Sequence, residues 1–366
     1  MTPAARRTAA LFALMLAACS STPQKPLLPV QDPLADLISQ KTAVPPAPAF
    51  FNQPAPSVAQ TGYAANPNVQ AFIRHQTQNG LDAQYLADFF ARAGYRANII
   101  GIMNRPATTR PWYVFQKNNA GAQKIGAGRT FYQQNRAALD NAAARYGVPA
   151  PLIAAIIGIE TDYGKNMGSI PVADALATLA FDYPRRGEFF QKELGEFLQL
   201  AQQQGLDPLS YKGSFAGAMG MVQFMPSSFR KWAADGDGDG RIDIWNNVSD
   251  AAASAANYMK QHGWQTGRPM LVEAAVEPNP QTDALADAKT ALNHTVGDLR
   301  RMGVQPLSGS LSDSEPALLY RLETAPGQYR YYIGLQNFHT VWQYNHSKMY
   351  VTAVRDIANG IGNGGL

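Results

Sequence analysis

The sequence predicts an α+β fold that is predominantly helical and includes a small antiparallel sheet. Helical patterning dominates the chain from residue 66 onward, whereas strand signals are sparse and occur late. The 366 residues, 46% of them hydrophobic, provide enough apolar material for one large or two ordinary globular domains. A small sheet appended to a helical body satisfies these observations.

Helix signals recur along the chain, and the segment 149–164 is the most apolar of them. Leucine and isoleucine surround its axis, which predicts a core helix. Asn68 is a candidate cap for the first helix, and Gly94 is a candidate stop for the second. The expected helices are one after Asn68 and those at 81–94, 131–146, 149–164, 172–181, 186–204 and 250–262. The expected strands are 270–276, 317–323 and 328–334.

The charge of the chain argues against nucleic acid as a partner. The formal net charge is only +4, and charged residues make up 16% of the sequence. Nucleic-acid-binding proteins usually present dense Lys/Arg runs with aromatic residues between them. The basic residues of this chain are scattered instead.

The first residues have the pattern of a bacterial lipoprotein signal. Arg6 and Arg7 precede an apolar run at 9–18 that is too short to span a bilayer, and small residues lead to Cys19. Cys19 is the single cysteine of the chain, and it stands where a lipoprotein carries its acyl chains. The alternative is a buried free thiol. We expect residues 1–18 to be a signal peptide and Cys19 to anchor the protein to a membrane.

A proline-rich segment follows the predicted anchor. Nine of the 25 prolines fall between residues 20 and 60, where hydrophobic periodicity is weak. Such a composition is typical of a disordered, partly extended linker. We therefore expect a tether at 19–65 and the folded region at 66–366.

Glu160 is the strongest candidate for a catalytic group. The residues three, four and seven positions before it are all isoleucine, so its helical face is apolar. Burial raises the pKa of a carboxyl group, which suits a general acid near neutral pH. The alternative is a buried glutamate paired with an arginine. Asp162 should project from nearly the opposite side of the helix, which makes it a poor partner for a two-carboxylate glycosidase.

An acidic segment at 235–250 matches the start of an EF-hand calcium loop. Asp235, Asp237 and Asp239 occupy positions 1, 3 and 5, and Arg241 supplies a backbone carbonyl at position 7. Position 12 is Asn246, so the bidentate glutamate of an EF-hand is missing there. The alternative is an acidic turn without metal. We expect a structural Ca²⁺ here and no catalytic cofactor.

Several short motifs, taken together in order, resemble the lytic murein transglycosylase B family in its membrane-bound, lipoprotein form. The first is Ile-Glu-Thr-Asp-Tyr-Gly at 159–164, which contains Glu160. The resemblance covers roughly residues 66–360. The remaining motifs lie at 174–179, 183–186, 213–220, 223–228, Tyr258 and 344–347.

This resemblance implies a lysozyme-like core and cleavage of the MurNAc-β-1,4-GlcNAc bond of peptidoglycan. In the family, a single glutamate protonates the glycosidic oxygen and then accepts a proton from the C6 hydroxyl of the same MurNAc. That hydroxyl closes onto C1 and leaves a 1,6-anhydroMurNAc end. The lack of a second aligned carboxylate in this sequence agrees with such a mechanism, since the substrate supplies the nucleophile.

The resemblance also implies the remaining site residues. Ser214 and Gln223 correspond to substrate hydrogen-bonding residues, and Asp250 corresponds to a later calcium ligand. The residues implied to line the cleft are Tyr258, Tyr344, Asn345 and Tyr350. Asn345 or a tyrosine hydroxyl is expected to orient Glu160, although core packing is the alternative for each tyrosine. Phe115 stands where a family tyrosine is expected and lacks the hydroxyl, so it is left out of the site.

The implied location is the periplasmic side of the outer membrane, because Ser20 rather than aspartate follows Cys19. Peptidoglycan glycan strands are the implied substrate, and other cell-wall enzymes are candidate partners. Two other functions stay open on the sequence. One is a hydrolytic muramidase on the same scaffold, which would leave reducing ends, and the other is a non-catalytic peptidoglycan-binding scaffold.

Overall fold

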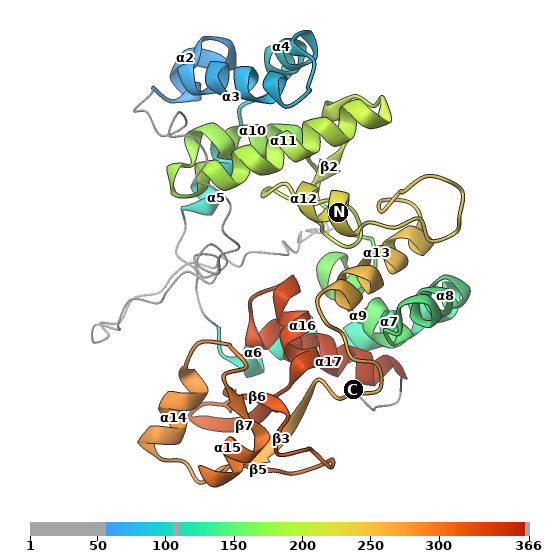
Figure 1. Cartoon of the computed structure of the whole chain (residues 1–366), viewed down its shortest axis with the longest axis vertical. Helices are drawn as coiled ribbons and strands as arrows, with labels where there is room; N and C mark the ends of the chain where they lie inside the picture. The colour runs from blue at the N-terminus through green and yellow to red at the C-terminus, as the bar shows by residue number, and fades with distance from the viewer. Residues whose placement is uncertain (1–55, 105–109, 363–366) are drawn as a thin grey trace, which may run out of the picture. The chain divides into compact units, whose positions relative to one another are not determined.

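The computed structural model describes residues 56–104 and 110–362, which form two compact units. The first unit comprises 56–104 and 164–231, and the second comprises 110–163 and 232–362. The predicted signal peptide, Cys19 and the tether up to residue 55 lie outside the described residues. The predicted fold class is confirmed: helices predominate, and the strands form small antiparallel sheets (Figure 1).

The first unit is built on helices α10 and α11, which pack against each other (Figure 1). Aromatic rings from α2, α3, α4 and α10 meet edge-on in its core, with Phe72, Phe90 and Phe181 less than 6 Å apart by ring centroid. Its helices are α2 (Val58–Ala65), α3 (Pro67–Gln78), α4 (Ala83–Arg92), α5 (Ala97–Met103), α10 (Val172–Asp182), α11 (Gly187–Gln204) and, at its end, α12 (Pro226–Trp232). Two short strands, β1 (Ile170–Pro171) and β2 (Lys212–Gly213), pair antiparallel.

Helix α2 lies inside the segment where the sequence predicted a tether, so the folded region starts earlier than residue 66. Val58 and Tyr63 are buried. The backbone N–H of Val58 donates to Asp182 Oδ1 at 2.8 Å, and Tyr63 packs among the aromatic rings of the core. The contacts of Val58 and Tyr63 explain why the chain becomes helical shortly after Pro56, although this segment is rich in proline.

Two predicted helix ends of this unit also differ from the structure. The cap of α3 is Asn66 rather than Asn68, and its Oδ1 accepts from the N–H of Asn68 at 3.0 Å. Helix α4 ends at Arg92, before Gly94. Gly94 serves a packing role instead: its N–H donates to Asp174 Oδ1 at 2.7 Å, and a Cβ there would lie 2.9 Å from Asp174 Oδ2.

The second unit surrounds α9 (Ala150–Thr161) with other helices, so nearly all of α9 is buried, as its apolar composition predicts. The predicted helix 131–146 is in fact two helices, because Asn135 leaves helical geometry between them. The other helices are α6 (Trp112–Asn119), α7 (Ala122–Gln134), α8 (Arg136–Tyr146), α13 (Val248–Gln261), α16 (Gln336–Tyr344) and α17 (Lys348–Gly362). Helices α16 and α17 were not predicted from the sequence, and α17 packs along α9 (Figure 1).

A five-stranded antiparallel sheet belongs to the second unit, in the order β4-β6-β7-β3-β5. The three predicted strands correspond to β3 (Leu271–Ala275), β6 (Pro316–Ala325) and β7 (Gln328–Gly334). The two edge strands have only two residues each, β4 (His294–Thr295) and β5 (Gln305–Pro306), too short for a sequence pattern. Helices α14 (Pro280–Asp287) and α15 (Val296–Arg301) complete this part.

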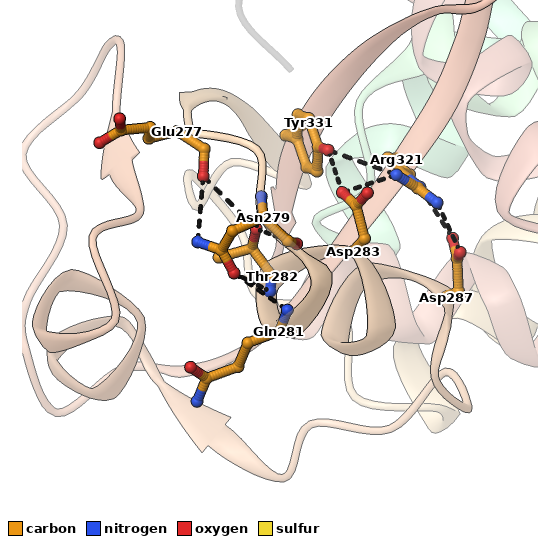
Figure 2. A network of polar contacts seen from close by, with 8 residues as sticks. All are labelled: Glu277, Asn279, Gln281, Thr282, Asp283, Asp287, Arg321 and Tyr331. Atoms are coloured by element: carbon orange, nitrogen blue, oxygen red, sulfur yellow. Dashed lines mark hydrogen bonds and ion pairs between the residues drawn. The ribbon is translucent and has the colours of Figure 1, made fainter.

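Helix α14 is fastened to the sheet by a polar network around Arg321 of β6 (Figure 2). The guanidinium pairs with Asp283 at 2.6 Å and with Asp287 at 2.8 Å, one helical turn apart on α14. Tyr331 of β7 donates its hydroxyl proton to Asp283. An Asn279–Thr282 capping box starts the helix (Figure 2). These side-chain contacts hold α14 against β6 and β7, which pair with each other.

Within the described residues, no single helix is long and apolar enough to cross a membrane. The consecutive helices α8 and α9 meet that test only as a pair, and 115° separates their axes.

Candidate active site

Glu160 lies in the last turn of α9, and its side chain is buried at 6% exposure. The helix begins after Pro149, contains no charged residue before Glu160, and ends at Thr161. Its isoleucines fill the core on either side. A run of strongly apolar residues therefore carries a single carboxyl group into the interior of the second unit.

The hydroxyl of Tyr350 donates a hydrogen bond of 2.6 Å to Glu160 Oε1. Tyr350 is itself buried and lies in the first turn of α17, which packs along α9. Among the alternatives that the sequence left for the group that orients Glu160, the structure places a tyrosine hydroxyl there. One oxygen of the carboxyl group is thereby fixed by a neutral donor.

Burial raises the pKa of Glu160 to about 7, and the hydrogen bond from Tyr350 opposes this rise only in part. Among the residues that the structure describes, no cation forms an ion pair with Glu160, contrary to the alternative of a buried Glu–Arg pair. A carboxyl group with a pKa near 7 exists in both protonation states at neutral pH. It is thus suited to donate a proton and later to accept one.

Tyr344 and Tyr258 pack edge to face beside this carboxyl group, with ring centroids 4.8 Å apart. Burial first, and then the charge of Glu160, raises the pKa of Tyr344 well above its usual value. The hydroxyl of Tyr258 donates to the backbone carbonyl of Gln343 at 2.8 Å, so it helps to hold the end of α16. Asn345 follows α16 in extended geometry, and its carbonyl accepts from Ser347 at 2.7 Å.

His262 joins this cluster, although the sequence analysis did not single it out. Its ring stacks on Tyr258 with centroids 3.8 Å apart and an interplanar angle of 15°. Trp232 packs edge-on against both rings. Tyr258 lies on α13 and His262 directly follows that helix, and their spacing of four residues is the signal that would have predicted the contact.

Ser214 and Gln223 belong to the first unit, where each is engaged with its own loop. Ser214 Oγ accepts from the N–H of Ala218 at 3.0 Å. Gln223 has a left-handed backbone with φ of 49°, and its amide nitrogen donates to Gly220 and Met167 carbonyls at 2.9 and 3.2 Å. These contacts fix the orientation of the Gln223 amide.

Two further residues of the sequence analysis are placed by the structure. Phe115 is buried and stacks against Trp112. The prediction that Asp162 projects from the helix opposite Glu160 is wrong, because α9 ends at Thr161 and Asp162 is left-handed, with φ of 52°. Its carboxylate pairs with Lys124 at 2.6 Å.

The acidic loop brings three of its predicted ligands together. One carboxylate oxygen each of Asp235, Asp237 and Asp250 lies within 4.8 Å of the others, which is the donor set that a hard cation such as Ca²⁺ prefers. Asp250 is fully buried and accepts from the N–H groups of Gly236 and Asp243 at 2.8 and 2.7 Å. Burial, with the charges of the two other carboxylates, raises its pKa, although both N–H bonds lower it.

The other two predicted ligands lie differently. Asp239 Oδ1 accepts from the N–H of Arg241 at 2.8 Å and is outside the three-carboxylate group. Asn247, which was not among the predicted residues, caps α13 and donates from Nδ2 to Asp237 Oδ2 at 2.8 Å. Its signal was an asparagine directly before an apolar helix.

Comparisons with known proteins give a consistent result. Residues 64–359 match the family model described as the transglycosylase SLT domain. The chain is 38% identical to membrane-bound lytic murein transglycosylase B of Escherichia coli (strain K12) over 362 residues, 95% of each chain. The Escherichia coli lytic transglycosylase SLT35, solved in complex with calcium, is 37% identical, with a TM-score of 0.74 over 82% of this chain and 94% of that one. SltB3 from Pseudomonas aeruginosa, in complex with NAG-anhNAM-pentapeptide, is 32% identical, with a TM-score of 0.71 over 81% of this chain and 79% of that one.

Proposed function

The chain belongs to the family of the transglycosylase SLT domain, and from this premise we propose that it cleaves the MurNAc-β-1,4-GlcNAc bond of peptidoglycan with Glu160 as its single general acid and base. Its membership makes it a lytic transglycosylase. The observation that carries the finer proposal is the buried Glu160 carboxyl, with a pKa raised to about 7 and a hydrogen bond only from a neutral donor.

The reaction follows from the two protonation states of this group. Protonated Glu160 gives its proton to the glycosidic oxygen, so the bond from that oxygen to C1 of MurNAc breaks and GlcNAc leaves with a 4-hydroxyl. The Glu160 carboxylate then takes the proton of the C6 hydroxyl, and the C6 oxygen bonds to C1. The product has a 1,6-anhydroMurNAc end, no water is consumed, and Glu160 regains its proton.

Tyr350 orients Glu160 for both steps. Its hydroxyl donates to Oε1, which leaves Oε2 as the oxygen that exchanges the proton with substrate. The same donor stabilises the carboxylate between the two steps. Ser214, Gln223, Tyr344, Tyr258 and Asn345 remain proposed substrate-binding residues on the strength of the family motifs.

Digestion of purified peptidoglycan, followed by mass spectrometry of the fragments, tests the proposal. We expect fragments that end in 1,6-anhydroMurNAc, lighter by one water than reducing-end fragments. Reducing ends would identify a hydrolytic muramidase, and intact strands would identify a binding scaffold. SltB3, the relative solved with an anhNAM-containing ligand, supports the first outcome.

Tyr350→Phe is expected to lower kcat about tenfold or more and to move the alkaline limb of the pH dependence of kcat/KM to higher pH. The hydroxyl stabilises the charged form of Glu160, so its loss raises the pKa of Glu160 further, and the acid keeps its proton to a higher pH. A hydrogen bond to a charged group contributes about 1.5–3 kcal/mol, which sets the expected loss in kcat. Steady-state kinetics on soluble glycan fragments between pH 5 and 9 provide the measurement.

Tyr329→Phe is the matched control, since Tyr329 is an exposed residue of β7 in the same unit. It should leave the pH profile and kcat unchanged. If Tyr350→Phe showed the profile of the wild type as well, its hydroxyl would not act on Glu160.

We also propose a structural Ca²⁺ in the loop at 235–250. Its support is the group of three carboxylate oxygens, together with the calcium complex of SLT35. Asp235, Asp237 and Asp250 would bind the cation, with Asp239 and the carbonyl of Arg241 as further ligands. When bound, the cation would offset the mutual repulsion of carboxylates from the loop and from the first turn of α13, the helix that carries Tyr258.

A lipid anchor at Cys19 completes the proposal and places the enzyme on the periplasmic side of the outer membrane. Its support is the lipoprotein signal and the membrane-bound relative in Escherichia coli. Acyl chains contribute about 0.8 kcal/mol for each buried methylene, so a multiply acylated cysteine would hold the protein firmly. Peptidoglycan is then within reach of the tethered enzyme, where other cell-wall enzymes are candidate partners.

Cys19→Ser is expected to release the protein from the membrane fraction without changing its activity on soluble glycan fragments. No residue of the proposed site depends on the anchor, whereas activity on the intact wall should fall because the local concentration of enzyme is lost. Fractionation and assays on both substrates measure this. Ser20→Ala serves as the control and should stay with the membranes. A Cys19→Ser protein that still sedimented with membranes would contradict the anchor.

A further inference from the structure

The chain leaves α9 in an unusual conformation directly after Glu160. The helix ends at Thr161, and the next two residues, Asp162 and Tyr163, have φ of 52° and 61°. The left-handed region is disfavoured for residues that have a Cβ, so two consecutive examples need support from their surroundings. Residues held in this way concentrate at sites where geometry matters for function.

Lys124 of α7 supplies that support. Its Nζ pairs with Asp162 Oδ1 at 2.6 Å and donates to the carbonyl of Gly158 at 3.2 Å. The side chain of Lys124 is 11% exposed and that of Asp162 is 31% exposed, so the pair is partly shielded from solvent. The backbone carbonyl of Lys124 accepts from the hydroxyl of Tyr163 at 2.8 Å. One residue thus binds both left-handed residues and the last turn of α9.

Close packing of α7 against α9 adds to these contacts of Lys124, which together we call the clamp. A Cβ at Gly158 would lie 2.5 Å from the ring of Tyr163, and a Cβ at Gly128 of α7 would also collide with its hydroxyl. Phe131 packs against the same ring, with centroids 5.3 Å apart. The Tyr163 ring therefore fills a space that only glycine leaves open, and it cannot shift without disturbing both helices.

We propose that Lys124 is a positioning residue for Glu160, acting together with Asp162. The pair holds the left-handed residues that follow α9 and thereby fixes the turn that carries Glu160. The Glu160 carboxyl group then stays within hydrogen-bond distance of the Tyr350 hydroxyl. Lys124 contacts neither substrate nor Glu160 in this role. The inference rests on the proposed function of Glu160, but it concerns the backbone conformation rather than the proton transfer.

A matched pair of substitutions separates conformation from charge. Asp162→Ala and Asp162→Gly both remove the carboxylate, but only glycine adopts a φ near +50° without strain. We expect Asp162→Ala to lower kcat about tenfold or more with KM changed less than about twofold, since a small misplacement of a catalytic group has effects of this size. Asp162→Gly should stay within about twofold of the wild type in both constants.

Lys124→Met tests the other partner, and it should show the same loss in kcat as Asp162→Ala. The double variant Lys124→Met/Asp162→Gly should recover most of that loss, because glycine no longer needs the clamp. Lys117→Met is the control for loss of a lysine, since Lys117 is exposed on α6. If Lys124→Met failed to fold, the Ala and Gly variants of Asp162 would still decide the question.

Amide hydrogen exchange at residues 160–163 gives a readout that does not depend on activity. Protection should fall in Asp162→Ala and Lys124→Met and return in the double variant. Equal losses of kcat in Asp162→Ala and Asp162→Gly, or wild-type kcat and protection in Lys124→Met, would overturn the inference. A wild-type protein that cleaved no peptidoglycan would contradict the proposed function instead, while the exchange data would still test the clamp.

Discussion

Glu160→Gln is expected to abolish cleavage of purified peptidoglycan, with a loss in kcat of at least about 10²–10⁴-fold. The amide keeps the size of the side chain and can still accept from Tyr350, but it cannot give a proton to the glycosidic oxygen or take one from the C6 hydroxyl. Binding of glycan fragments should be largely retained. Release of anhydro fragments, followed by mass spectrometry, gives the rate.

The same variant should be more stable than the wild type above pH 7. This result would exclude unfolding as the cause of its inactivity. The pKa of Glu160 is raised to about 7 in the folded state, whereas in an unfolded chain it has its ordinary value of 4.5. The carboxyl group therefore contributes its full stability below pH 4.5 and loses it as the pH rises through 7. This pKa shift corresponds to roughly 3 kcal/mol of unfolding free energy at most. The glutamine variant does not titrate, so it does not lose this stability at high pH.

Glu315→Gln is a suitable control for the activity measurement. Glu315 is also a buried glutamate of the second unit, but it pairs with Arg268 at 2.6 Å. Its amide variant should keep activity even if the melting temperature falls. Substantial turnover by purified Glu160→Gln would remove Glu160 from the mechanism.

Calcium is expected to raise the melting temperature of the wild type by several degrees relative to a sample in EDTA. The three carboxylates repel one another without a cation, and the proposed Ca²⁺ would bind only the folded arrangement. Such binding stabilises the protein by about 2.7 kcal/mol at a hundredfold excess over Kd, and about 2–4 °C accompany each kcal/mol in a chain of this order of size. Differential scanning calorimetry in EDTA and in millimolar calcium measures the shift.

Asp250→Asn should abolish this response, because it removes the charge of the buried ligand. Asp88→Asn, on the exposed surface of α4 in the other unit, should leave the response intact. Equal midpoints of the wild type with and without calcium would mean that the loop is an acidic turn and not a metal site.

Local sequence patterns predicted much of the fold, because the strongest signals came from continuous apolar segments. Helix α9 is of this kind, and strands β3, β6 and β7, whose signals were weaker, also agree with the expectation within a few residues. The patterns predicted least well where tertiary contacts determine the bounds of an element. Nothing in the segment 131–146 indicated a break at Asn135, and the buried Val58 and Tyr63 extend the folded region into a proline-rich segment.

The same distinction applies to the candidate site. The apolar face of α9 was enough to propose Glu160 as a buried acid. The donor to its carboxyl group is 190 residues away in sequence, so periodicity could not identify Tyr350. Lys124 was missed for a related reason: its role depends on the left-handed conformation of Asp162, which the sequence analysis treated as part of the helix.

The long sequence separation of Glu160 and Tyr350 also bears on when the enzyme becomes active. A growing chain emerges from its N-terminal end, so α9 is complete long before α17 has been made. Until then, the acidic group lacks the helix that buries it and the hydroxyl that orients it. Contacts this distant in sequence also form late in folding, because a large loop must close first. We therefore expect a chain truncated before α17 to be inactive, because Glu160 would lack both its buried surroundings and the Tyr350 hydroxyl.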